Sequence, residues 1–461
     1  MKESLEVEGT FWLPTKPTKK ILGTFFYNPG DIPKLILKGA LNESGKEVVI
    51  PPEFITVDFV YGTTLQGEPI TLFNCIQFKA DGKTGLEGSY FQTEYIIHFA
   101  FFGVHLIGKT DMAFETLSID FFNLKSWYNN NCIHTENPKS GTEIITFIRP
   151  NPIDIIVDGF QIQLNAFEGM KLQQNFASIT TNPRIIIRGV DKKQFMEYMQ
   201  LVRLIQNFFT FVITRPSFVI EMNGYISKHE ESKQSFMPTK IYFSPIGWQP
   251  ETKEIFWSNM MLSFIEIEDT LPTLLSEWII KSELLKPVYD LYLANYYKNT
   301  YPENEFLNLT QAIETYHRRK FGGKYLSDEE YQSKLYKLLV NAIPEYTTTE
   351  FRNSLINGKL RYANEFSLRS RLLFLINQVS DRYDVDFLKS GKNSAFSKLI
   401  ADTRNYLTHY SIELKEKAVT SGSALSDLNY KLDLIVRILL LEEIGVNSEK
   451  ISAIIRKTKR Y

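Results

Sequence analysis

Apolar and polar positions alternate with a period of two through most of the chain up to about residue 265, which is the pattern of half-buried strands. Turn-forming sequences such as NPGD, NESGK and ADGKTG separate the alternating runs. The clearest runs cover 34–41, 70–78, 90–102, 116–122, 153–164 and 183–189. We therefore predict a β-rich N-terminal region.

Two segments interrupt this alternation. The first is a predicted helix that runs from about Asp191 to about Phe211, and Asp191 suits its N-cap. Its apolar residues recur at helical spacing: Phe195, Met199, Val202 and Ile205. The second is the polar stretch NNNCIHTENPKSGT (129–142), which is typical of a linker or long loop. This stretch divides the region into two predicted β sub-domains, 1–135 and 143–265, and the second contains the helix.

After about Leu271 the periodicity becomes helical almost throughout. One predicted helix carries an apolar stripe that alternates by three and four: Leu425, Leu428, Leu432, Ile435 and Leu439. Short polar connections favour an antiparallel bundle, so we predict a helical connector over 270–303 and an all-α bundle over 304–461. The fold class is α+β. The predicted helices cover about 273–298, 305–321, 327–340, 364–380, 394–411 and 424–443.

Composition narrows the class of protein. The chain has 461 residues with 43% hydrophobic content, which is ample for more than one core. A net charge of −1 excludes a globally basic nucleic-acid binder. Cys75 and Cys132 are the only cysteines, so neither a disulfide framework nor a thiolate metal site is expected. Without an apolar leader or a membrane-spanning run, we expect a cytoplasmic protein with no membrane partner.

The segment GVHLIGKT, Gly103 to Thr110, matches the spacing of a P-loop. A phosphate cradle requires small residues and must open a helix, because backbone N–H groups have to point at the phosphate. Here the intervening residues are bulky, and the sequence that follows favours strand or turn. We predict a strand hairpin; ATP binding that is lost on changing Lys109 would favour a nucleotide site instead.

The predicted helix 394–411 carries an unusual set of polar residues. On a wheel of about 100° per residue, Phe396, Ile400, Thr403, Leu407 and Tyr410 form the buried stripe. Arg404, Asn405, Thr408 and His409 fall on an adjoining polar arc. Asn405 and His409 are spaced i,i+4, as are Arg404 and Thr408, so each pair can touch. One rigid surface thus presents a cation, an imidazole and two hydrogen-bonding side chains.

This set suits RNA cleavage. When a ribose 2′-OH attacks its own phosphate, histidine can transfer the protons and arginine can stabilise the charge on the phosphorane. Asn405 can orient the imidazole or bond a phosphate oxygen. Neither a metal nor another cofactor is required. The alternative is local: His409 caps or hydrogen-bonds nearby, and Arg404 pairs with Asp402 or Glu413.

The segment TRNYLTHY (403–410) resembles the Arg-Asn-x-x-x-His signature of HEPN-domain ribonucleases. The sequences at 309–331 and 276–297 extend the resemblance to the ApeA-type anti-phage HEPN proteins. It implies a metal-independent endoribonuclease in which Arg404 and His409 are the catalytic pair and Asn405 supports them. It also implies a homodimer or higher oligomer in which two chains form a composite cleft. The implied substrate is RNA or tRNA. The implied role is abortive infection, which a phage-derived trigger sets off. The β-rich half would sense or regulate. The alternative is a catalytically silent HEPN module that binds RNA or a protein.

Several nearby residues have more than one interpretation. Glu314 can hold the Arg404 guanidinium across the bundle, or it can pair locally with Arg318 at i,i+4, which we favour slightly. Thr408 would support the catalytic pair. His317 follows a core stripe and is expected to be structural or to contact RNA. Tyr406 and Tyr410 can stack on bases, although the wheel places Tyr410 in the core.

Overall fold

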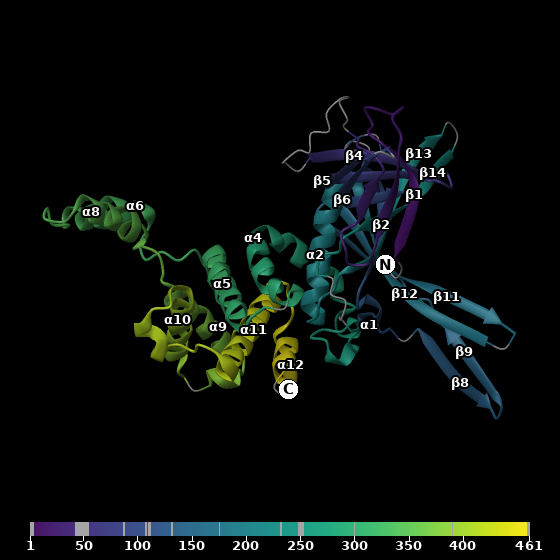
Figure 1. Cartoon of the computed structure of the whole chain (residues 1–461). Helices are drawn as coiled ribbons and strands as arrows, with labels where there is room; N and C mark the ends of the chain where they lie inside the picture. Colours follow the sequence, from purple (N-terminus) through teal and green to yellow (C-terminus); the bar gives the residue numbers. More distant parts are fainter. Residues whose placement is uncertain are drawn as a thin grey trace. The chain divides into compact units, whose positions relative to one another are not determined.

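The chain folds into two units that differ in secondary structure (Figure 1). Contacts within the chain separate Met1–Ile280, which is rich in strands, from Lys281–Tyr461, which is helical. The predicted α+β class is therefore confirmed. The computed structural model describes residues 4–41, 55–85, 88–106, 108, 112–130, 132–174, 176–230, 233–247, 253–298, 300–389 and 391–458.

Six strands of the first unit close into a barrel, because β5 and β6 pair with each other in addition to their other neighbours. Closure leaves no free edge in these strands and encloses a core that includes Phe11, Phe25, Tyr95 and Ile97. In barrel order the strands are β6 (Gly88–Phe102), β3 (Lys34–Leu37), β2 (Ile21–Tyr27), β1 (Leu5–Trp12), β4 (Ile55–Thr64) and β5 (Pro69–Gly85).

The remaining large strands continue the same sheet from β6, so both predicted β sub-domains share one hydrogen-bonded sheet. These strands are β14 (Lys233–Phe243), β13 (Val219–Glu230), β7 (Ala113–Phe121), β12 (Phe176–Gln194), β11 (Phe160–Gln173) and β10 (Ile153–Val157). Helix α2 (Phe195–Ile213) packs against β7 and β12, and Phe211 on it stacks on Trp278.

The predicted start of that helix is wrong. Asp191 belongs to β12, which pairs with β7 up to Gln194 after an irregularity in register. Gln194 is the N-cap instead, and its backbone N–H donates to Glu197 Oε2 at 2.8 Å in a capping box. The sheet therefore determines where the helix begins.

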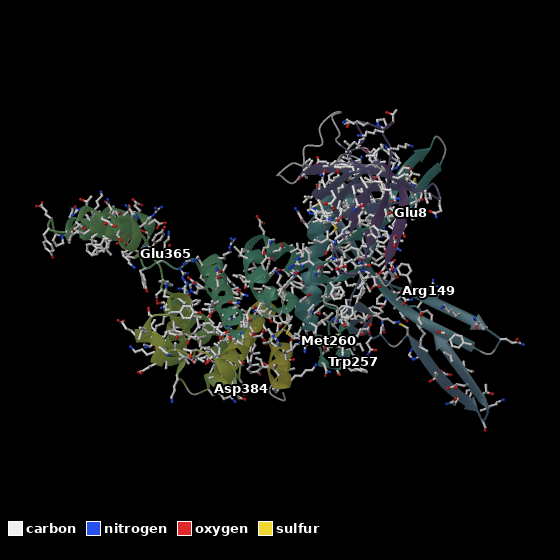
Figure 2. All side chains as sticks on the ribbon, in the orientation of Figure 1. Glu8, Arg149, Trp257, Met260, Glu365 and Asp384 are labelled. Carbon is white, nitrogen blue, oxygen red and sulfur yellow. The ribbon has the colours of Figure 1, made fainter. Side chains whose placement is uncertain are left out.

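The polar stretch predicted as a linker is a β-hairpin. Its strands are β8 (Ile133–Lys139) and β9 (Thr142–Phe147), which form a separate two-stranded sheet. Nearly every residue of the hairpin is exposed, so the sequence lacks the alternation that marks a buried strand face. Arg149, labelled in Figure 2, follows the hairpin and forms an ion pair with Glu168 of β11.

The segment that resembles a P-loop joins β6 to β7, and strand β7 follows it in place of the required helix. The predicted hairpin is wrong, because β6 pairs with β3, β5 and β14 whereas β7 pairs with β12 and β13. The start of this connection is bonded to β4 and β5 of the barrel: His105 Nε2 bonds the Gly62 carbonyl at 2.8 Å, and the Leu106 N–H donates to Thr71 Oγ1 at 3.0 Å. Lys109 and Thr110 lie outside the described residues.

In the second unit, α5 (Pro302–Phe321), α9 (Leu368–Arg382), α10 (Asn393–His409) and α11 (Gly422–Glu443) form the bundle. The predicted stripe on α11 is confirmed, since all five of its apolar residues are buried. Glu443 at the end of α11 accepts a hydrogen bond from the Tyr316 hydroxyl at 2.6 Å and pairs with Lys281 at 3.2 Å. Helices α4 (Leu271–Tyr297), in which the unit boundary falls, and α12 (Ser448–Thr458) complete the long helices.

Between α5 and α9 the chain forms a helical arm that extends away from the bundle (Figure 1). The sequence predicts a helix over its first half, at about 327–340, but none over its second half, which begins with α8 (Thr349–Ser354). Tyr331 and Ile343 are buried, whereas Leu338, Tyr346 and Phe351 are exposed. The arm comprises α6 (Asp328–Glu330), η3 (Tyr331–Tyr336), α7 (Lys337–Asn341), α8, η4 (Leu355–Lys359) and η5 (Leu360–Tyr362).

Candidate active site on helix α10

Helix α10 is fixed to the bundle by its apolar face. Ile400, Thr403 and Leu407 are buried as predicted, and the helix packs against α9 and α5. Phe396 is half-buried and contacts the ring of Phe387 at 5.7 Å. Thr403 Oγ1 accepts a hydrogen bond from the Val419 N–H at 3.0 Å, which holds the following segment against the helix. The position of the polar arc is therefore determined by the core beneath it.

The arc lies at the surface. Arg404 and Asn405 are half-buried, whereas Thr408 and His409 are exposed. Arg404 Nη1 donates to Asn405 Oδ1 at 3.3 Å, so the amide contacts the guanidinium rather than the imidazole. Thr408 Oγ1 donates to the backbone carbonyl of Arg404 at 2.8 Å. Asn405 and Thr408 thus contact Arg404 and the turn that carries it.

The alternative interpretation of the polar arc predicts that Arg404 pairs with a carboxylate, Asp402 or Glu413. Asp402 pairs instead with Lys398, one turn back, at 2.8 Å. Across the described ranges, Arg404 has no carboxylate within 4.0 Å, and the His409 imidazole makes no hydrogen bond. The guanidinium keeps most of its donors, and the imidazole is open to solvent. Both groups can therefore engage an external phosphate and its sugar.

The predicted burial of Tyr410 is wrong. The helix ends at His409, and Tyr410 takes a left-handed conformation with φ 52° as the C-cap. Its N–H donates to the Tyr406 carbonyl at 2.6 Å. The helical wheel does not apply beyond the C-cap, so the side chain leaves the buried stripe and is 67% exposed.

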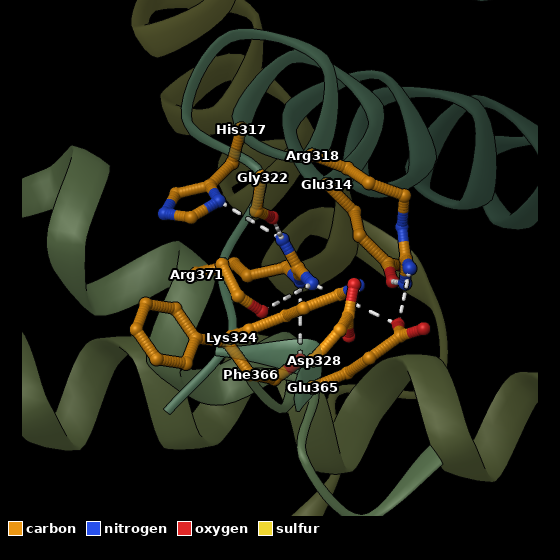
Figure 3. A network of polar contacts seen from close by, with 10 residues as sticks. Glu314, His317, Arg318, Gly322, Lys324, Asp328, Glu365, Phe366 and Arg371 are labelled. Carbon is orange, nitrogen blue, oxygen red and sulfur yellow. Dashed lines mark hydrogen bonds and ion pairs between the residues drawn. The ribbon is translucent and has the colours of Figure 1, made fainter. Parts of the chain in front are cut away.

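Glu314 takes part in a different cluster, shown in Figure 3. Its carboxylate pairs with Arg318 at 3.2 Å, so the expected local pair is confirmed. Arg318 also pairs with Glu365, which follows the arm. Glu314 therefore helps to attach the end of the arm to α5, and the alternative contact with Arg404 is not formed in this structure.

At the centre of this cluster lies Arg371 on α9, which the sequence reasoning missed. It is 1% exposed and donates to the carbonyls of Phe366 at 3.1 Å, Gly323 at 3.3 Å and Gly322 (Figure 3). Because these carbonyls lie just before and just after the arm, one guanidinium holds both of its ends. The sequence feature that could have identified Arg371 as buried is its place on the same helical stripe as the apolar residues Leu375 and Val379.

His317 is structural, as one of its two interpretations predicted. It is 1% exposed, and its Nδ1 accepts a hydrogen bond from Arg371 Nη1 at 3.0 Å. Arginine can only donate, so the neutral ring carries its proton on Nε2. Burial, followed by the charges of Arg371 and Arg318, lowers the pKa of His317 to about 4.

This lowered pKa predicts an acid sensitivity. Between pH 6.5 and about 4 the unfolded chain protonates this histidine while the folded chain does not, so the free energy of unfolding falls as the pH falls. The expected loss across the window is about 3 kcal/mol. His317→Asn retains an acceptor for Arg371 and removes the titration. Urea unfolding at pH 7 and pH 5 should show that the free energy of unfolding falls less in this variant than in the wild type. Equal losses in the two proteins would contradict the lowered pKa of His317.

Comparisons with known proteins add a family. The sequence profile described as ApeA N-terminal domain 1 matches residues 6–278, and the profile described as Apea-like HEPN matches residues 307–450. No curated protein and no solved structure matches the chain. In the described part of the chain, no helix is long and apolar enough to cross a membrane.

Proposed function

Because the chain belongs to the ApeA family of HEPN-domain proteins, we propose that it is a metal-independent endoribonuclease of bacterial defence. HEPN domains are generally ribonucleases, and the second family match contains all four residues of the arc. Arg404 and His409 are the proposed catalytic pair, and Asn405 is the proposed supporting residue. The substrate is RNA.

One observation carries the proposal: Arg404 and His409 lie on one stiff helix, and neither is occupied by a partner that would have to leave. Arg404 contacts only the neutral amide of Asn405 among the described side chains, and His409 is exposed. A guanidinium already paired with a carboxylate would have to break that pair before it could bind phosphate. The arc on α10 requires no such rearrangement.

The chemistry follows from the two groups. His409 exchanges a proton with the ribose oxygens while the 2′-OH attacks the adjacent phosphorus and the 5′-oxygen leaves. Arg404 donates to the phosphorane oxygens as negative charge develops on them. Asn405 limits the orientations of the guanidinium through its 3.3 Å contact. The products are a 2′,3′-cyclic phosphate and a 5′-hydroxyl.

The reaction removes one proton and adds another at different oxygens. A single imidazole holds one transferable proton at a time, so a second proton-transfer group makes the step easier. A two-fold pair of chains would supply a second His409 to the same cleft. We therefore propose a homodimer as the active form, which agrees with the frequent dimerisation of HEPN domains.

The test uses purified full-length protein, total tRNA and EDTA, without ATP. We expect fragments that end in 2′,3′-cyclic phosphate. RNA binding without turnover would favour a silent HEPN module and contradict the enzyme. Cleavage that requires added ATP would favour nucleotide binding at Gly103 to Thr110.

Family membership also supports two finer proposals: tRNA as the target, and a phage-derived trigger sensed by the β-rich unit. Infected cells that carry the wild type should accumulate cut tRNA, and cells that carry His409→Ala should not. Intact tRNA in both cultures would contradict the proposed target.

A further inference from the structure

An exposed aromatic residue follows the proposed catalytic histidine at the end of α10. Tyr410 is 67% exposed and follows His409 in the chain. Consecutive Cα atoms lie about 3.8 Å apart, so the ring and the imidazole leave the backbone at neighbouring points. Arg404, on the polar arc of the same helix, lies within two turns. The last turns of one helix therefore carry a ring, an imidazole and a guanidinium.

Tyrosine is an unfavourable residue for this backbone position. A left-handed C-cap favours glycine, because a side chain crowds the carbonyl that follows it. Within the described ranges, the other non-glycine residues with positive φ are Asn74, Asn123, Asp158 and Thr214, and Tyr410 is the only aromatic one among the five. Backbone geometry therefore does not account for a tyrosine here, which points to a role for its side chain.

The ring is supported as well as exposed. Tyr406, one turn earlier and half-buried, meets Tyr410 edge to face, with ring centroids 5.7 Å apart and planes at 65°. Such a contact restrains an aromatic side chain and reduces the entropy that it loses on binding a second ring. Because Tyr410 remains mostly exposed, part of its surface is open to a planar ligand.

We propose that Tyr410 is the residue on which a base of the substrate stacks, so that the site takes an unpaired nucleotide. This inference rests on the proposed ribonuclease function and specifies the form of its substrate. Bases in a duplex are already stacked on their neighbours, and only a single strand or a loop can offer a base face to a protein ring. Stacking next to His409 would hold the adjacent ribose and phosphate within reach of the arc. Tyr410 is a positioning residue in this scheme.

The experiment measures binding in full-length His409→Ala protein, in which the RNA stays intact. The probes are a short single-stranded RNA carrying 2-aminopurine, whose fluorescence falls on stacking, and the same sequence in a duplex. We expect tighter binding of the single strand and quenching on binding. Tyr410→Gly should weaken binding by about five- to a hundredfold and abolish the quenching, whereas Tyr410→Trp should retain both.

Glycine also separates this role from a structural one. It fits the left-handed C-cap, so Tyr410→Gly should leave the Tm unchanged or raise it while RNA binding weakens. Tyr346→Ala is the matched control, since that tyrosine is 88% exposed on the arm and should contribute nothing. The inference is overturned if Tyr410→Gly binds RNA as the parent does, if Tyr346→Ala weakens binding equally, or if the parent binds duplex as tightly.

Failure of this inference differs from failure of the proposed function. If the wild type cuts RNA and Tyr410→Gly cuts it with the same KM and kcat, stacking is refuted and the nuclease remains. If the single strand stacks on Tyr410 but the wild type never cuts it, the nuclease is refuted and the binding role of Tyr410 remains.

Discussion

Replacing His409 with alanine is expected to reduce RNA cleavage by about 10²- to 10⁴-fold, the range supplied by a positioned proton-transfer group. The imidazole is exposed and makes no hydrogen bond to the described residues, so its loss removes no hydrogen bond among them. The free energy of unfolding should therefore change by less than about 0.5 kcal/mol. Single-turnover cleavage of tRNA, with circular dichroism and sedimentation of the variant, measures both quantities.

A matched histidine provides the control. His134 is exposed on β8, in the other unit, and His134→Ala should cut RNA at the wild-type rate. Full activity in purified His409→Ala would refute the role of this imidazole. A loss of activity accompanied by unfolding would also contradict the expectation, because the structure gives His409 no part in stability.

The position of the arc could be predicted from the sequence because a helix wheel depends only on local geometry. The wheel predicts Ile400, Thr403 and Leu407 in the core, and all three are buried. Once these residues are fixed, Arg404 and His409 must lie on the polar arc that adjoins the buried stripe. The prediction used a single element, and no distant contact was needed.

The same wheel failed at Tyr410, where the helix stops. No glycine or proline marks the end, because the left-handed C-cap is the tyrosine itself. Without that signal, periodicity extends the buried stripe by one residue too many. The wheel therefore misses the exposed tyrosine that follows His409 in the chain, which is the residue proposed to select the substrate.

Other errors arose where tertiary structure decides the local form. Asp191 is a good N-cap by residue type, but pairing of β12 with β7 keeps it in a strand. The exposed hairpin of β8 and β9 buries neither face, so its sequence carries no alternation. Arg371 donates to the carbonyls of Gly322 and Gly323, which lie 49 and 48 residues earlier in the chain, so its own helix does not reveal these partners.

The helical arm is another region that the local sequence pattern predicts poorly. Its residues bury few side chains of their own, so the hydrophobic pattern that predicts helices is weak over 349–362. Arg371 compensates at the base of the arm by bonding carbonyls on both sides of it. Removing that guanidinium would leave these part-buried carbonyls and the buried Nδ1 of His317 without their donor, which is why Arg371 matters to the fold of this unit.

The second large effect is expected for Arg404→Lys, which keeps the charge and removes the planar fork of donors. An ammonium cannot offer two parallel N–H groups to a phosphorane, so kcat should fall by about 10²- to 10³-fold while KM changes little. The change should cost little stability, because Arg404 is half-exposed and, among the described residues, its side chain hydrogen-bonds only to Asn405. Arg456→Lys on α12, an exposed arginine of the same unit, should behave as the wild type.

If Arg404→Lys retained the full rate, Arg404 would act as a simple positive charge, and bidentate stabilisation of the phosphorane would have to be abandoned. If instead KM rose and kcat stayed constant, Arg404 would bind the ground state and the transition state equally, and the stabilising group would have to be sought elsewhere on the arc.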